Sequence, residues 1–200
     1  MENDPDNEWL ARGPRLRLPA EMIRDNALAA AGLLKLKVGG PPVNPYELVE
    51  AFKPFKASEG EGLFRRSLYT TWRRTSPPPA MQTFDAPRRA VCSAKRERTD
   101  SPLQALILLN GTQFVEAARV LGQTLVKETG GEVPRMIEQG MLRCLSRKPD
   151  AREQEILTRL WEEQRAHFEK HPEEAAKLVK IGSTPVEGDV VSVAAATVLA

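Results

Sequence analysis

The distribution of proline constrains the fold of this chain more than any other feature of its sequence. Eight of the 16 prolines lie between Pro41 and Pro87, and proline lacks the backbone N–H that a helix interior or a sheet ladder needs. We therefore predict an ordered but irregular segment over residues 37–100. A loop this long is uncommon in a compact domain unless it is functional, disordered or laid across a surface. Three aromatic side chains favour packing on a surface: Tyr46, Phe52 and Phe55.

Helical periodicity precedes this segment. Apolar residues at helical spacing predict a helix over Pro19–Leu34, with Pro19 at a favourable first position. Its apolar face is expected to consist of Ile23, Ala27, Ala30 and Leu34. The irregular segment itself is expected to hold a short helix over Tyr46–Phe52, extended stretches over Ser67–Trp72 and Thr75–Pro79, and a turn at Asp85–Pro87.

Helical signals also follow the irregular segment. Ser101 and Gln104 have the spacing of a capping box around Pro102, which predicts one helix that continues to about Glu128. Its apolar face is expected to include Leu106, Leu109, Ala117, Leu121 and Leu125. Further helices are predicted over residues 134–147, 150–170, 172–179 and 189–200, the second opened by the capping pair Asp150 and Glu153. In the first of these we expect Ile137, Met141, Cys144 and Leu145 to point inward.

These patterns predict a mainly α fold with little or no β structure. We expect one incomplete helical domain over residues 1–200. Within it, residues 1–8 form a disordered tail, residues 37–100 the irregular arginine-rich segment, and residues 101–199 the remaining helices.

Positive charge is concentrated in the middle of the chain. The formal net charge is only +2, but the stretch 64–104 has nine basic and three acidic residues. Arginine binds anions through a planar fork, and aromatic rings stack on sugars or bases. The candidate site for an anion or glycan consists of Arg65, Arg66, Tyr69, Trp72, Arg73, Arg74, Arg96 and Arg98. Nucleic acid is disfavoured because no motif of a known nucleic-acid-binding fold is present.

A structural role is the favoured alternative for these arginines. Irregular backbone needs many polar partners. The arginines would then bridge backbone carbonyls and pair with the acidic residues Glu21, Asp25, Asp85, Glu97 and Asp100.

Three carboxylates are candidate acid groups. Glu21 and Asp25 lie four residues apart on one predicted helix, and Asp85 lies in a predicted turn. Paired carboxylates catalyse glycoside hydrolysis when their separation is right. An ordinary surface pair beside Arg24 is the favoured interpretation, so no catalytic residue is assigned.

Metal and thiol chemistry find little support in the sequence. Glu163, His167 and His171 recur every four residues, but Pro172 moves His171 off helical geometry, and no HExxH motif is present, so we expect no metal site. The two cysteines form no CxxC pair, which excludes a zinc ribbon or a CxxC redox pair, and no CxxCH motif attaches haem. A disulfide between Cys92 and Cys144 and two free buried thiols both stay open.

Neither a signal peptide nor a membrane span is expected in this chain. Residues 1–8 are acidic and polar, whereas a signal peptide starts basic and continues apolar. No apolar stretch approaches the ~20 residues that a membrane span needs.

Several sequence blocks resemble a known family. They are Arg17–Asp25, Gly39–Pro41, Phe64–Thr70, Phe84–Pro87, Arg96–Thr99 and Ser101–Asn110. Together they resemble the planctomycete PSD-one domain, a domain of unknown function, from about Asp4 to Asn110. The resemblance implies an exported, periplasmic or cell-envelope bacterial protein whose upstream part carries a cytochrome-c-like module. Haem would then belong to that upstream part, and this chain would hold no cofactor. Compared with family members, the chain lacks a preceding stretch and the end of the last helix, so we expect a fragment.

We therefore expect a structural or interaction module that closes a multidomain envelope protein and whose partners are the upstream domains. Two alternatives stay open. One is part of a hydrolase that acts on polysaccharide at a site shared with the upstream part. The other is a module that binds acidic polysaccharide. We do not expect this chain alone to be an enzyme.

Overall fold

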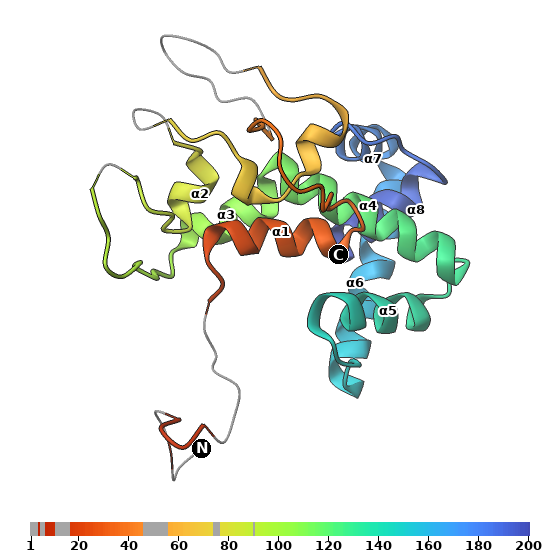
Figure 1. Ribbon diagram of the computed structural model, residues 1–200. Helices are drawn as coiled ribbons and strands as arrows, with labels where there is room; N and C mark the ends of the chain where they lie inside the picture. Colours follow the sequence, from red (N-terminus) through yellow and green to blue (C-terminus); the bar gives the residue numbers. More distant parts are fainter. Residues whose placement is uncertain (1–3, 5–6, 11–16, 46–55, 74–76, 90) are drawn as a thin grey trace.

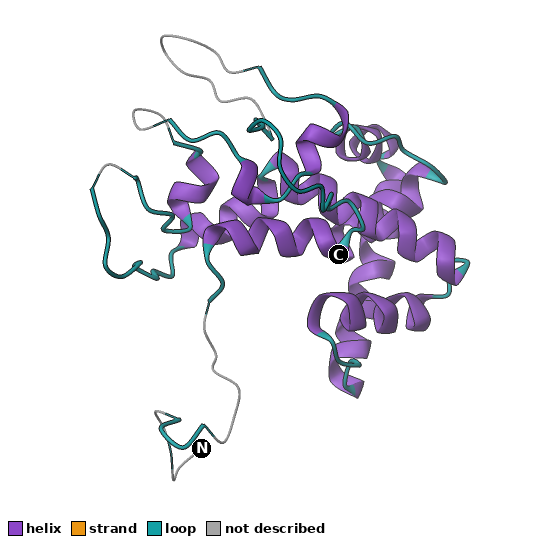
Figure 2. Cartoon of the chain, in the orientation of Figure 1, coloured by secondary structure: helices purple, strands orange, loops and turns teal. Residues whose placement is uncertain are grey.

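The computed structural model describes residues 4, 7–10, 17–45, 56–73, 77–89 and 91–200 as helices joined by irregular segments (Figures 1 and 2). These residues contain no strand, and their sheet-like pairing is limited to two isolated parallel bridges, Lys35–Arg65 and Val43–Thr70. The predicted mainly α fold is confirmed. The elements are α1 (Ala20–Ala30), η1 (Gly60–Phe64), η2 (Ser67–Tyr69), α2 (Pro79–Thr83), α3 (Pro102–Asn110), α4 (Thr112–Thr129), α5 (Val133–Leu145), α6 (Ala151–Lys170), α7 (Pro172–Val179) and α8 (Val190–Leu199).

Helix α4 is the centre of the fold, because α1, α3, α5 and α8 all pack against it. Figure 1 shows it running between α1 and α8. Its buried residues Ala117, Leu121 and Leu125 form one core with residues of α5 to α8, including Trp161 and Ala194. These three α4 residues lie on the apolar face that the periodicity predicts.

The first helix is shorter than predicted, and the predicted face residues Ile23 and Ala27 pack half-buried against the core, while the most buried side chains lie beside them. It ends at Ala30 rather than Leu34, and the chain turns back as the N–H groups of Leu33 and Leu34 both donate to the carbonyl of Leu28. The fully buried side chains of α1 are those of Ala20, Arg24 and Leu28. The helix therefore directs a charged side chain, not a purely apolar face, toward the irregular segment.

The single helix predicted to continue to Glu128 is broken in two. The backbone at Gly111 is extended, with φ −67° and ψ 124°, which separates α3 from α4. A Cβ at this position would lie 2.6 Å from the carbonyl oxygen of Ile107. Only glycine fits such a close approach, and the sequence pattern alone does not reveal it.

The capping box predicted around Pro102 is wrong, although the helix does begin there. The side chain of Ser101 makes no capping hydrogen bond. Gln104 is buried, and its side-chain oxygen accepts from Arg17 at 2.8 Å rather than from the N–H of Ser101, while its amide donates to the carbonyl of Thr83 at 2.8 Å. Gln104, which the local pattern predicts as part of the cap, therefore makes tertiary contacts instead.

The irregular segment contains only short helical turns among its described residues. The stretch predicted to be extended from Ser67 begins with η2, and Pro79 is the first residue of α2 rather than part of an extended run. Asp85 has φ +60° and lies in a turn, as predicted. The short helix predicted over Tyr46–Phe52, and Phe55, lie outside the described residues.

The C-terminal helices follow the prediction closely. Helices α5 to α8 all appear, and the Asp150–Glu153 capping box is present at the start of α6. The inward face predicted for α5 is partly wrong. Ile137 is buried together with Met136, whereas Cys144 and Leu145 are exposed. Both cysteines are free and exposed, so the disulfide and the buried pair of thiols are both wrong.

Candidate functional site

Arg24 is the polar link between α1 and the irregular segment. Its side chain is only 3% exposed. It donates to the carbonyls of Leu63 at 2.6 Å and Arg65 at 2.9 Å, and to the side-chain oxygen of Gln113 on α4 at 2.7 Å. One guanidinium therefore satisfies backbone carbonyls of the segment and connects it to two helices. Arg24 is therefore not the surface neighbour of Glu21 and Asp25 that the sequence pattern predicts.

Arg65 of the predicted anion site serves the same purpose. Its guanidinium donates to the carbonyls of Pro41 at 2.8 Å, Lys37 at 3.3 Å and Gly39. It also stacks on the ring of Tyr69, 3.8 Å from the ring centroid. The Tyr69 hydroxyl accepts the N–H of Gly39. These contacts fold residues 37–41 over residues 65–69.

Two of the candidate acid groups bind the segment from α1. Asp25 accepts the N–H and the hydroxyl of Ser67 at 2.8 and 2.7 Å, and Arg66 lies 3.9 Å from its second oxygen. Glu21 pairs with Arg96 at 2.8 Å. Each carboxylate thus has a basic partner or backbone donor from the arginine-rich stretch.

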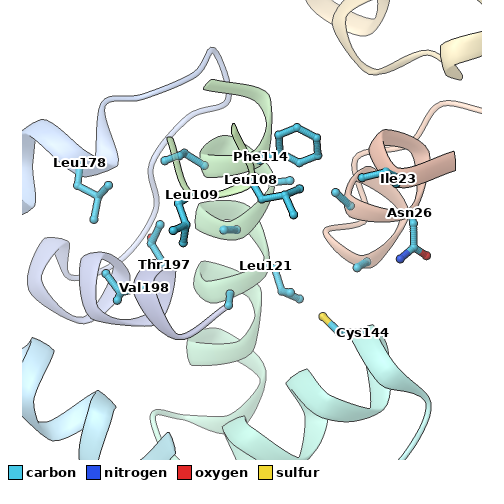
Figure 3. A pocket seen from close by; sticks show the side chains of 16 residues that line it. Ile23, Asn26, Leu108, Leu109, Phe114, Leu121, Cys144, Leu178, Thr197 and Val198 are labelled. Carbon is cyan, nitrogen blue, oxygen red and sulfur yellow. The ribbon is translucent and has the colours of Figure 1, made fainter. Parts of the chain in front are cut away.

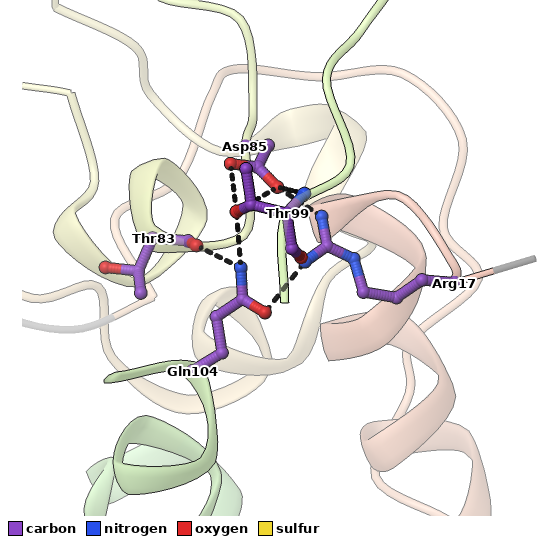
Figure 4. Close-up of polar contacts among 5 residues, drawn as sticks. All are labelled: Arg17, Thr83, Asp85, Thr99 and Gln104. Atoms are coloured by element: carbon purple, nitrogen blue, oxygen red, sulfur yellow. Dashed lines mark hydrogen bonds and ion pairs between the residues drawn. The ribbon is translucent and has the colours of Figure 1, made fainter. Parts of the chain in front are cut away.

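The third candidate acid group, Asp85, lies at the centre of a polar cluster (Figure 4). It pairs with Arg17 and accepts the N–H of Thr99 at 2.7 Å, while Gln104 joins Arg17, Thr83 and Thr99. Burial raises the pKa of Asp85, but the hydrogen bonds from Arg17 and Thr99 outweigh it, and the pKa is lowered from its ordinary value. A general acid at neutral pH needs a raised pKa. With its lowered pKa, Asp85 is suited to stabilising the local fold rather than to proton transfer.

The remaining predicted site residues are more exposed. The Trp72 indole N–H donates to the carbonyl of Arg88 at 3.3 Å, and Arg89 stacks 4.8 Å from the centroid of its ring. Arg73 and Arg98 are exposed, whereas Arg74 lies outside the described residues. The described part of the predicted anion site therefore combines the buried or half-buried side chains of Arg65, Tyr69 and Trp72 with exposed arginines.

An apolar groove lies on another part of the surface and was missed by the sequence analysis. It has a volume of about 520 Å³ and is lined by residues of α1, α3, α4, α5, α7 and α8. Figure 3 shows side chains from these helices around it, almost all of them apolar. The labelled residues are Ile23, Asn26, Leu108, Leu109, Phe114, Leu121, Cys144, Leu178, Thr197 and Val198. This volume falls in the range of about 300–1,000 Å³ that is typical of ligand-binding clefts.

Helix α3 continues this apolar surface outward. Leu103, Leu106 and Leu109 are 54%, 56% and 75% exposed, and Leu108 is 44% exposed. The buried or half-buried contacts of α3 come from Gln104 and Ile107. Leu103, Leu106 and Leu109 recur every three residues, so they are neighbours on the helix surface. Contiguous apolar surface of this kind marks interaction sites.

The polar groups of the groove do not form catalytic machinery. Cys144 also lines the groove, and although the residue is exposed, partial burial of its thiol against the groove wall raises the pKa of that thiol despite the charge of Arg143. Since the thiolate is the nucleophile, a raised pKa makes the thiol less reactive. The other polar lining residues are Asn26 and Thr197, which are not titratable. The groove is therefore suited to binding apolar surface.

Two signals could have located these features. Ala20, Arg24 and Leu28 recur every four residues, so the buried arginine shares a helix face with two buried residues. Leucines or isoleucine occupy five of the nine positions of α3, on several sides of the helix, which is more than one core-facing stripe requires.

The described helices include none with both the length and the apolar character needed to cross a bilayer. A family model described as "Protein of unknown function (DUF1553)", PSD1, matches residues 1–161. The match covers α1 to α5 and about half of α6. It also extends beyond Asn110, where the motif resemblance weakens. No curated protein and no solved structure matches the chain.

Proposed function

This chain belongs to the PSD1 family, whose function is unknown, and from its surfaces we propose that it is a structural and interaction module. It forms the C-terminal part of a bacterial envelope multidomain protein. Its groove and the outer face of α3 dock onto a preceding domain of the same protein. The observation that supports this most is the exposure of Leu103, Leu106 and Leu109 beside an apolar groove.

The arginine contacts fit this role because they hold the groove's walls in place. Arg24 connects α1 to α4 through Gln113, and both helices line the groove. A preformed site loses less conformational entropy on binding than a flexible one. An apolar helix or loop from the preceding domain would insert its side chains into the groove, as amphipathic helices do in other hydrophobic grooves.

A binding experiment tests the proposal. The preceding domain of the parent protein is produced separately and titrated with this chain by calorimetry. We expect saturable binding that weakens at least about tenfold when Leu106 and Leu109 are changed to Asp, because charges then enter an apolar interface. Ile156→Asp on α6 is the matched control, since Ile156 is also exposed at 43% and lies away from the groove. Equal affinity of the Leu106/Leu109 variant and the control contradicts the proposal.

Binding of an acidic glycan is the second candidate, favoured by the exposed stretch 91–100 and its neighbours. Arg88, Lys95 and Arg98 are exposed, and their side chains pair with no carboxylate among the described residues. The site would thus include Arg98 but exclude Arg65, which is buried. Heparin affinity that falls steeply with salt, and falls further in Arg88→Ala/Arg98→Ala than in Arg152→Ala/Arg159→Ala, supports it. Affinity independent of salt refutes it.

A further inference from the structure

Two histidines and two glutamates meet where α6 ends and α7 begins. His167 Nε2 lies 2.8 Å from a carboxylate oxygen of Glu174, and His171 Nδ1 lies 3.7 Å from one of Glu173. One potential ligand atom from each of His171, Glu173 and Glu174 lies within 4.8 Å of the others. The rings of His167 and His171 are 4.8 Å apart. Glu174 therefore contacts His167 directly and lies within 4.8 Å of a ligand atom of His171.

The local backbone explains why these side chains converge. His171 precedes Pro172 and has φ −126° and ψ 63°, so it ends α6 and immediately precedes α7. A proline disfavours helical geometry at the residue before it. The resulting bend places the first turn of α7 beside the last turn of α6.

The structure changes the set of ligands that the sequence suggests. Glu163, which shares the spacing of the histidines, is paired with Arg159 at 3.9 Å instead. Glu173 and Glu174 follow the bend and were not considered from sequence spacing. The expectation of no metal site rested on the displacement of His171 by Pro172 and on the missing HExxH motif, and it did not include these two glutamates.

The geometry suits a small divalent ion. Zinc binds imidazole nitrogen and carboxylate oxygen at about 2.0–2.2 Å, so neighbouring ligand atoms of a tetrahedral site are about 3.4 Å apart. The cross-distances of 2.8 and 3.7 Å lie on either side of that value, and the widest separation among the ligand atoms of His171, Glu173 and Glu174, up to 4.8 Å, has to close on binding. All four side chains are about half exposed, so their rotamers can adjust without disturbing the core. Two carboxylates with two neutral imidazoles also balance the charge of the ion.

We propose that His167, His171, Glu173 and Glu174 bind one divalent transition-metal ion, for which zinc is the probe. Imidazole with carboxylate oxygen is a donor set suited to zinc and its neighbours rather than to calcium or magnesium. The bound ion fixes the bend between α6 and α7. Both helices pack on α8, so the ion stabilises that corner of the fold. The site is remote in sequence from α3, and the proposal does not depend on the docking function.

Calorimetry on the untagged, chelator-treated full chain tests the proposal. Titration with zinc chloride is expected to show one saturable site of micromolar affinity, and zinc is expected to raise Tm. His167→Ala, His171→Ala and Glu174→Gln should each lower the affinity at least about tenfold, because losing even a group that orients a ligand costs about 10- to 100-fold. Glu163→Gln is the matched control and should bind zinc as the native chain does. Circular dichroism verifies that each variant is folded.

Three results would overturn the proposal. The first is an absence of saturable binding at millimolar zinc. The second is equal affinity of the His171→Ala variant and the native chain. The third is binding that persists in His171→Ala but is lost in Cys144→Ser or Cys92→Ser, which assigns the ion to the thiols.

Discussion

The fully buried carboxylate of Glu116 accepts both the backbone N–H and the hydroxyl of Thr184, each at 2.7 Å. Ser183 donates its N–H to the same oxygen at 2.7 Å. Three residues further along α4, Arg119 is also fully buried and donates to the carbonyl of Thr184 at 2.8 Å. The loop between α7 and α8 is therefore attached to α4 through a pair of buried charged side chains.

Removing the charge of Glu116 should destabilise the chain. Glu116→Gln leaves Arg119 buried beside a neutral group and weakens the hydrogen bonds from the loop. We expect a loss of about 2–4 kcal/mol in the free energy of unfolding, measured by urea denaturation. Glu187→Gln is the control, because Glu187 is exposed and should change stability by under about 0.5 kcal/mol. Equal stability of the two variants would show that the buried contacts contribute nothing.

The close approach of α4 and α8 gives a second prediction. A Cβ on Gly122 would lie 2.7 Å from the backbone carbon of Ala196, whereas one on Gly140 would meet only the tip of Leu125 at 3.3 Å. Both glycines are inside helices, where alanine is intrinsically better by about 1 kcal/mol. We expect Gly122→Ala to lower Tm and Gly140→Ala to leave Tm unchanged or raise it. A higher Tm for Gly122→Ala would mean that α8 does not pack this closely.

The buried guanidinium of Arg24 gives a third prediction. Arg24→Met retains much of the side-chain volume but leaves the carbonyls of Leu63 and Arg65 without a donor. We expect a loss of about 3–5 kcal/mol in the free energy of unfolding, with faster hydrogen exchange in residues 56–73. Arg159→Met on α6 removes an exposed arginine and should have little effect. Unchanged exchange in residues 56–73 would show that Arg24 does not hold this segment.

Buried polar contacts between residues far apart in the sequence could not be predicted from the sequence alone. Local signals act within a few residues, and they located α5 to α8 well, as with the Asp150–Glu153 capping box. The burial of Arg24 depends on carbonyls about 40 residues away. Gln104 does not cap its helix because its side chain donates to the carbonyl of Thr83, about 20 residues away. The exposed leucines of α3 follow from the break at Gly111, which depends on a steric contact.

The cap of α6 gives a prediction about pH. Hydrogen bonds from Arg147 and from the N–H of Asp150 lower the pKa of Glu153 from its ordinary 4.5 to about 2. A carboxylate with a lowered pKa contributes stability that is present above 4.5 and is lost as the pH falls toward about 2. The Tm of the native chain should therefore exceed that of Glu153→Gln at pH 6, and the difference should shrink as the pH falls below 4.5. A difference that stays constant with pH would exclude the ionised carboxylate as its source.

The central claim is that the outer face of α3 is covered in the parent protein. Hydroxyl-radical footprinting of the isolated chain and of the full-length parent, read by mass spectrometry, tests it most directly because it needs no substitution. We predict that Leu103, Leu106 and Leu109 are oxidised several-fold more slowly in the parent, while exposed Ile156 on α6 reacts at the same rate in both. Equal oxidation of the α3 leucines in both proteins would contradict the claim.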